Sequence, residues 1–171
     1  MRTLKQFMLL MVTVTVVAFT GCKSDDDGGE SGGAANGTIE AKIDGASFTS
    51  LNLTSIATLA NGNLIIQGND ADGKSIVMTI FSYAGEGTYE FTGADPLILN
   101  IAAYVEADIN NPMNSQTWSA PFDTTMAGSV SISSETGDNI QGTFEFTGQN
   151  PNDNSQKVIS EGSFNLDKQT L

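Results

Sequence analysis

Apolar and polar positions alternate in short runs along the C-terminal three quarters of the chain, and turn-forming residues separate the runs. Residues 39–43 alternate with period two, and Asp44-Gly45 follows them as a hairpin turn. Asn61-Gly62 is a second hairpin signal, between the β-rich runs at 51–60 and 64–67. A period of two places alternate side chains on opposite faces of a strand. The pattern therefore predicts antiparallel strands joined by tight turns.

Two longer runs are apolar on both faces. In residues 75–83, Ile76, Met78 and Ile80 share one face, while Val77 and its alternate neighbours form the other. Residues 97–105 are similar, and such strands are typical of a covered, central position. No segment keeps a helical period with caps. We expect an all-β fold: one antiparallel β-sandwich or flattened β-barrel of roughly eight to ten strands.

One strand pattern occurs twice. GTYEFTG at 87–93 returns as GTFEFTG at 142–148, with the aromatic residues on one face and the Thr-Glu-Thr set on the other. Shared inside-outside patterning explains so short a match more simply than a duplication. Glu90 and Glu145 would form a carboxylate pair, as in glycosidases, if their strands brought them within about 5–9.5 Å. Solvated surface glutamates are the favoured interpretation.

The N-terminus has the pattern of a lipoprotein signal peptide. Arg2 and Lys5 precede a nearly continuous apolar run at 7–17, and Gly21 stands directly before Cys22, the single cysteine of the chain. The run is too short for a transmembrane helix, which needs about 20 apolar residues. We expect a signal peptide over 1–21 and lipidation of Cys22. The alternative is an ordinary signal peptide beside an incidental cysteine.

Residues 22–36 contain Ser, Asp, Glu, Gly and Ala but no large apolar side chain, which predicts a flexible tether. The run directly after the cysteine resembles the surface-export signal of Bacteroidetes lipoproteins; a solvated spacer is the alternative. This predicted export signal consists of Lys23, Ser24, Asp25, Asp26 and Asp27.

Composition excludes several function classes. The chain has no histidine, so Ser-His and Cys-His catalysis and His-ligated metals are excluded. The formal net charge is −13 and becomes −15 when Arg2 and Lys5 leave with the signal peptide. A field of that sign repels nucleic acid, so we expect no nucleic-acid partner. No cofactor is indicated, and any metal would be a hard ion such as calcium.

The strand motifs in their order carry a family resemblance. The pattern I-x-A-x-I-D-G-x-x-F at 39–48 is followed by a GTY strand and then by VSIS, GTFxFT and GSF between residues 130 and 164. This order resembles an uncharacterised family of Bacteroidetes lipoproteins and covers nearly all of the mature chain. The resemblance implies a membrane-anchored β-domain of unknown function and supplies no catalytic residues.

Two loops offer candidate ligand sites. Asp70 and Asp72 have calcium-loop spacing but lack the distal glutamate of an EF-hand, so a polar hairpin turn is favoured and no metal site is predicted. Residues 107–120 form the one long irregular insertion and contain the only tryptophan, Trp118. An exposed tryptophan would stack on a sugar or grip a peptide, whereas the alternative is a core position. The polar candidates beside it are Asn110, Asn111, Asn114 and Gln116.

These observations predict a domain at 37–171 behind the anchor. The expected function is a non-enzymatic binding or interaction module, exported and lipid-anchored in the outer membrane with cell-surface exposure. Its ligand would be a glycan, a peptide or an envelope partner. The alternatives are a lipocalin-like carrier of a small apolar molecule and, third, a carboxylate-based glycan hydrolase.

Overall fold

The computed structural model describes residues 33–95, 97 and 99–171. The predicted signal peptide, the lipidation site Cys22 and the export signal at 23–27 lie outside the described residues. The last residues of the predicted tether pack against the domain, because Ala34 is buried and the Ala35 N–H donates to Glu40 Oε1 at 3.2 Å. The domain thus begins before residue 37.

The described chain is almost entirely β-structure, as predicted, and its eleven strands slightly exceed the expected eight to ten. In chain order they are β1 (Thr38–Ile43), β2 (Ala46–Thr49), β3 (Ile56–Ala60), β4 (Asn63–Asn69), β5 (Lys74–Ile80), β6 (Gly87–Thr92), β7 (Ile101–Glu106), β8 (Gln116–Ala120), β9 (Met126–Glu135), β10 (Asn139–Gln149) and β11 (Gln156–Thr170). Two short 3-10 turns, η1 (Asn52–Thr54) and η2 (Pro112–Asn114), lie in the connections before β3 and β8.

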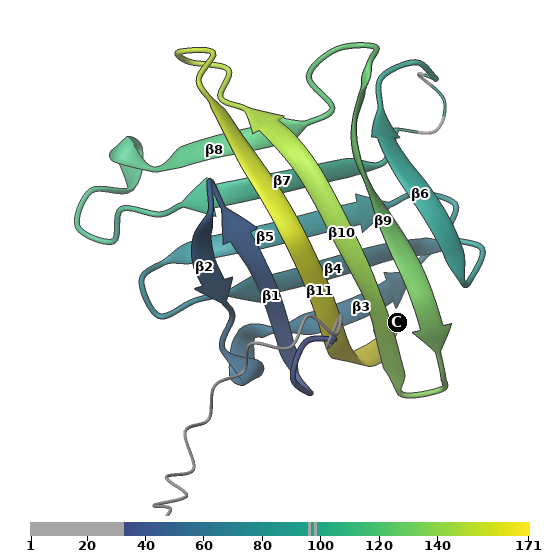
Figure 1. Cartoon of the computed structure of the whole chain (residues 1–171). Helices are drawn as coiled ribbons and strands as arrows, with labels where there is room; N and C mark the ends of the chain where they lie inside the picture. Colours follow the sequence, from purple (N-terminus) through teal and green to yellow (C-terminus); the bar gives the residue numbers. More distant parts are fainter. Residues whose placement is uncertain (1–32, 96, 98) are drawn as a thin grey trace, which may run out of the picture. The chain divides into compact units, whose positions relative to one another are not determined.

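The strands form two layers that cross steeply (Figure 1). One layer has the order β2-β1-β11-β10-β9-β6, and the other has β3-β4-β5-β7-β8. The layers join at two corners. The end of β11 pairs in parallel with β3, and Gln149 at the end of β10 pairs with Ser119 of β8. Seven strands therefore close into a flattened barrel, from which β1–β2 and β9–β6 extend.

The predicted hairpin turns are confirmed. Asp44 and Gly45, between β1 and β2, have φ values of 49° and 84°, and Asn61 and Gly62, between β3 and β4, have 52° and 77°. Two consecutive residues with positive φ make the type I′ turn, which Asp-Gly and Asn-Gly favour.

Three predicted segments need correction. Within 51–60, η1 precedes β3, and Leu53 is 98% exposed. Within 97–105, the strand begins only at Ile101, and Leu97 is 90% exposed. The supposed irregular insertion at 107–120 ends in the regular strand β8. In the first two cases the connection contains apolar residues, so its composition resembles that of a strand.

The space between the layers is filled by apolar side chains from both sheets. Ile76, Met78 and Ile80 on β5 are fully buried, as their alternation predicts. In the layer that contains β10 and β11, glycines leave room for aromatic rings to lie flat against the neighbouring strand. Phe144 and Phe164 are cross-strand neighbours of Gly162 and Gly142, and their ring centroids are 6.4 Å apart.

The repeated GTYEFT and GTFEFT strands lie on either side of one strand. β6 and β10 both pair with β9, in a register that aligns Tyr89 with Val130 and Phe144. The two copies meet the same central strand and the same core, so similar environments account for their similar patterns.

Candidate functional site

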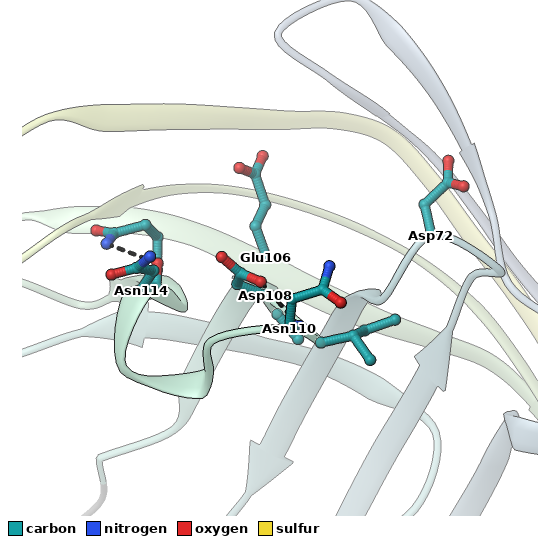
Figure 2. Close-up of a pocket in the computed structure, with 8 residues that line it drawn as sticks. Asp72, Glu106, Asp108, Asn110 and Asn114 are labelled. Atoms are coloured by element: carbon teal, nitrogen blue, oxygen red, sulfur yellow. Dashed lines mark hydrogen bonds between the residues drawn. The ribbon is translucent and has the colours of Figure 1, made fainter.

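A polar surface hollow of about 420 Å³ lies where two connections meet (Figure 2). We call it the loop hollow. Asp72 reaches it from the turn between β4 and β5, Glu106 is the last residue of β7, and Gln116 is the first residue of β8. The lining residues are Asp72, Glu106, Ala107, Asp108, Ile109, Asn110, Asn114 and Gln116.

In the turn between β4 and β5, the two weak metal candidates, Asp70 and Asp72, have different roles. Asp70 Oδ1 accepts the backbone N–H groups of Asp72 and Lys74 at 2.9 and 2.8 Å, so this carboxylate organises the turn itself. Asp72 instead lines the loop hollow. The N–H of Ala107 donates to the carbonyl of Gly73 at 3.0 Å and holds the turn beside the 107–115 connection.

Asp108 is held as an anion by its own loop. Its Oδ1 accepts the N–H groups of Asn111 and Asn110 at 2.9 Å each. Hydrogen bonds to Asp108 lower its pKa below the ordinary value. The largest contribution comes from the Asn111 N–H, and the Asn110 N–H and the Asn114 side chain add to it. The pattern Asp-x-Asn-Asn signals this local turn in the sequence, although Asp108 is not among the predicted site residues.

Glu106 lies between the loop hollow and a charged cluster behind it. Glu106 Oε1 accepts the Tyr104 hydroxyl at 2.9 Å and lies 3.4 Å from Lys157 Nζ. Lys157 is also 3.5 Å from Asp44 Oδ2. Burial, and then the hydrogen bond to Glu106, raises the pKa of Tyr104 far above its ordinary value, so Tyr104 remains a donor. No sequence signal points to Glu106, because only the fold places the end of β7 beside the β4–β5 turn.

The structure brings together three of the four predicted amide candidates. Asn110, Asn114 and Gln116 line the loop hollow, whereas Asn111 does not and directly precedes the turn η2. Gln116 Nε2 donates to the carbonyl of Asn114 at 3.1 Å (Figure 2). The hollow thus combines three carboxylates, which accept hydrogen bonds, with three carboxamides, which donate and accept them.

Trp118 occupies a core position, which is the alternative considered for it above. Its side chain is 6% exposed, and its ring centroid lies 5.7 Å from that of Tyr104. Trp118 Nε1 donates to Ser155 Oγ at 3.0 Å, and Lys157 Nζ lies 5.1 Å from the ring centroid. The indole therefore offers no free face to a ligand. Alternation in β8 explains this, because Trp118 and Ala120 both point inward.

Glu90 and Glu145 do not form a buried pair. Both are exposed, and β9 lies between their strands with Ser129 aligned to each glutamate. Two strand spacings separate the backbones by roughly 9.5 Å. Neither side chain lies in the enclosed environment that a catalytic acid needs.

Among the residues that the structure describes, no group of three Asp, Glu, Cys or His side chains is arranged to hold a metal ion. Within the same ranges, no helix has the length and apolar character needed to cross a bilayer.

Fold and site together define an all-β domain that carries a polar hollow between two surface loops. The chain belongs to the family described as a domain of unknown function, DUF6252, which matches residues 35–166. The match covers β1 through most of β11 and so includes every residue of the loop hollow. Comparison with curated proteins and with solved structures found no match.

Proposed function

We propose that this protein is an exported, lipid-anchored binding module of the Bacteroidetes type, displayed at the cell surface, which holds an extracellular glycan in the loop hollow. The observation that carries the proposal is the lining of the hollow. Carboxylates and carboxamides from two separate connections and the adjoining ends of β7 and β8 converge there on an open space of about 420 Å³.

A glycan suits this lining because sugar hydroxyls both donate and accept hydrogen bonds. Asp72, Glu106 and Asp108 supply acceptors, and the three carboxamides supply donors as well. Ile109, whose side chain is 77% exposed, adds an apolar contact at the same hollow. A peptide or an envelope protein is the alternative ligand, and its basic side chains would meet the same carboxylates.

Binding without catalysis is the better-supported activity. A general acid must be protonated near neutral pH, whereas the hydrogen bonds to Asp108 lower its pKa. The two glutamates considered for glycan hydrolysis are exposed and lie on strands that β9 separates. The carrier alternative has little support, because the buried residues of both layers pack together as one apolar cluster.

Glycan-array screening of the mature chain, followed by calorimetric titration of the hits, tests the binding proposal. Asp108→Asn and Asn114→Ala, made singly, should each weaken binding about tenfold, the effect of losing one hydrogen bond of about 1.4 kcal/mol. The matched control is Glu161→Gln, which also neutralises one exposed carboxylate but lies outside the loop hollow. Binding that survives both hollow variants, or a screen that yields basic peptides instead, contradicts the glycan proposal.

The anchor has its own test, independent of any ligand. Cys22→Ser should move the protein from the membrane fraction to the soluble fraction, because stable anchoring requires two or more acyl chains. Mass spectrometry of the wild-type protein should find acyl groups on Cys22. An unmodified Cys22 at the mature N-terminus would contradict the proposal.

A further inference from the structure

Asn150, a residue outside the loop hollow, is connected to its wall. Asn150 is fully buried and lies in the connection between β10 and β11. Its Nδ2 donates to Gln116 Oε1 at 2.7 Å, and Gln116 Nε2 in turn donates to the Asn114 carbonyl at 3.1 Å. A chain of hydrogen bonds therefore runs from a buried loop residue to two residues that line the hollow.

Backbone groups set the direction of this hydrogen-bond chain. Asn150 Oδ1 accepts the backbone N–H of Asn152 at 2.9 Å, and a backbone N–H acts only as a donor. The NH₂ group of Asn150 must then face Gln116, which places the oxygen of Gln116 toward Asn150. At the other end the Asn114 carbonyl only accepts, so it requires the NH₂ group of Gln116. Both carboxamides are fixed in one orientation.

We propose that Asn150 is a positioning residue that holds Gln116 with its NH₂ group toward the loop hollow. One hydrogen of that group is used by the Asn114 carbonyl, and the second remains for a ligand. Gln116 thus acts as a donor in a hollow whose carboxylates are acceptors, and it selects ligands that carry an acceptor at that point. The inference about ligand selection rests on the proposed binding function, whereas the positioning role does not.

The surrounding loop is held firmly enough to support this role. The Asn150 N–H donates to the Ser155 carbonyl at 2.8 Å, and the Asn150 carbonyl accepts the Asn154 N–H at 2.9 Å. Ser155 also receives the Trp118 Nε1 hydrogen bond at 3.0 Å. Gln116 and Trp118 share β8, so both hydrogen bonds tie this loop to the strand that borders the hollow.

Asn150→Asp tests the proposal in the mature protein without any ligand. An aspartate accepts the Asn152 N–H but presents a second oxygen to Gln116 Oε1, so the Gln116 side chain must turn or move. Backbone amides of Asn114 and Ser115 should then exchange hydrogen about tenfold faster. In NMR spectra, the Gln116 side-chain NH₂ signals should shift and lose protection. The matched control is Asn152→Asp, which adds the same charge at an exposed position of the same loop.

A second variant covers the case in which Asn150→Asp does not fold. Gln116→Glu keeps the acceptor for Asn150 but cannot donate to the Asn114 carbonyl, so exchange should accelerate at Asn114 and Ser115 and stay unchanged at 150–155. Two results would overturn the positioning role. One is hydrogen exchange that accelerates only at residues 150–155 in Asn150→Asp, and the other is an equal acceleration in the Asn152→Asp control. Normal exchange at Asn114 and Ser115 in Gln116→Glu would overturn it as well. Because these measurements use no glycan, they are separate from failure of the glycan screen.

Discussion

At the residue scale, Trp118 contributes to stability through several contacts at once. The indole packs against Tyr104, donates to Ser155 and lies beneath the Lys157 ammonium group. These contacts join β7, β8 and the start of β11. A change at Trp118 should therefore act on folding before it acts on any ligand.

Trp118→Ala should lower the free energy of unfolding by about 3–5 kcal/mol, because it leaves a large cavity in the core. Urea denaturation followed by circular dichroism measures the change. Met113→Ala is the control, since that side chain is 90% exposed and should change stability by about 0.5 kcal/mol at most. A Trp118→Ala protein with wild-type stability would contradict the core assignment.

Glu135 gives a pH-dependent contribution to stability. Its Oε1 lies 2.7 Å from Lys168 Nζ, its Oε2 accepts the Tyr83 hydroxyl at 2.8 Å, and its side chain is only 19% exposed. The hydrogen bond from Lys168, with that from Tyr83, lowers the pKa of Glu135 below its ordinary value of 4.5. Since the folded state has the lower pKa, the stabilisation is complete above the unfolded pKa and is lost as pH falls through the folded one.

Glu135→Gln should therefore cost roughly 1–3 kcal/mol at pH 7, because charged hydrogen bonds are replaced by neutral ones. The difference from wild type should shrink as pH falls below about 4.5 and vanish once wild-type Glu135 is protonated in both states. Urea unfolding at a series of pH values measures it. A difference that stays constant between pH 7 and pH 3 would rule out this linkage.

At the element scale, β10 and β11 depend on glycines where aromatic rings cross the strands. A Cβ at Gly142 would lie 2.6 Å from the Phe164 ring and would also collide with the Ser131 carbonyl. A Cβ at Gly162 would lie 2.5 Å from the Phe144 carbonyl oxygen. The two glycines therefore allow the close approach of β9, β10 and β11 on which the aromatic packing depends.

Gly142→Ala should destabilise the protein by about 1–3 kcal/mol, because the added methyl group forces backbone and ring to move apart. Gly137→Ala is the control: it lies in the turn between β9 and β10, and a Cβ there meets no atom within 4 Å. Thermal unfolding of both variants gives the comparison. Equal melting temperatures for Gly142→Ala and the wild type would show that the strands can separate without cost.

At the scale of the whole molecule, the C-terminal end of β11 closes the flattened barrel. Lys168, Gln169 and Thr170 pair in parallel with β3, and the Leu171 N–H donates to the Leu59 carbonyl at 3.0 Å. Lys168 also supplies the partner of Glu135. The last four residues thus join the two layers at one corner.

A chain that ends at Asp167 should lose about 3–5 kcal/mol of stability, since Glu135 remains without its cation in a largely buried position. Amide exchange should accelerate in β3, whose free edge is then exposed. Removal of Leu171 alone is the control and should cost about 1 kcal/mol, the value of one backbone hydrogen bond. Unchanged exchange in β3 after the longer truncation would show that the corner is not needed for closure.

Local chemistry was sufficient for much of the fold. The Asp44-Gly45 and Asn61-Gly62 turns and the buried face of β5 follow from the sequence, because turn preference and period-two alternation act between residues close in the chain. The all-β class follows from the same local signals. Part of the site was also predictable, since Asn110, Asn114 and Gln116 lie in the polar segment that the sequence singled out.

The tertiary structure alone decided which distant residues meet. Strand order places β7 beside β5, and this brings Glu106 and the 107–115 connection beside Asp72. The same order inserts β9 between the strands of Glu90 and Glu145. It also buries Trp118 and links Asn150 to Gln116 across 34 residues. Alternation specifies that a side chain faces inward or outward, but pairing between strands far apart in sequence depends on how all the buried faces pack together. For that reason the strands were determined locally, whereas the loop hollow exists only in the assembled barrel.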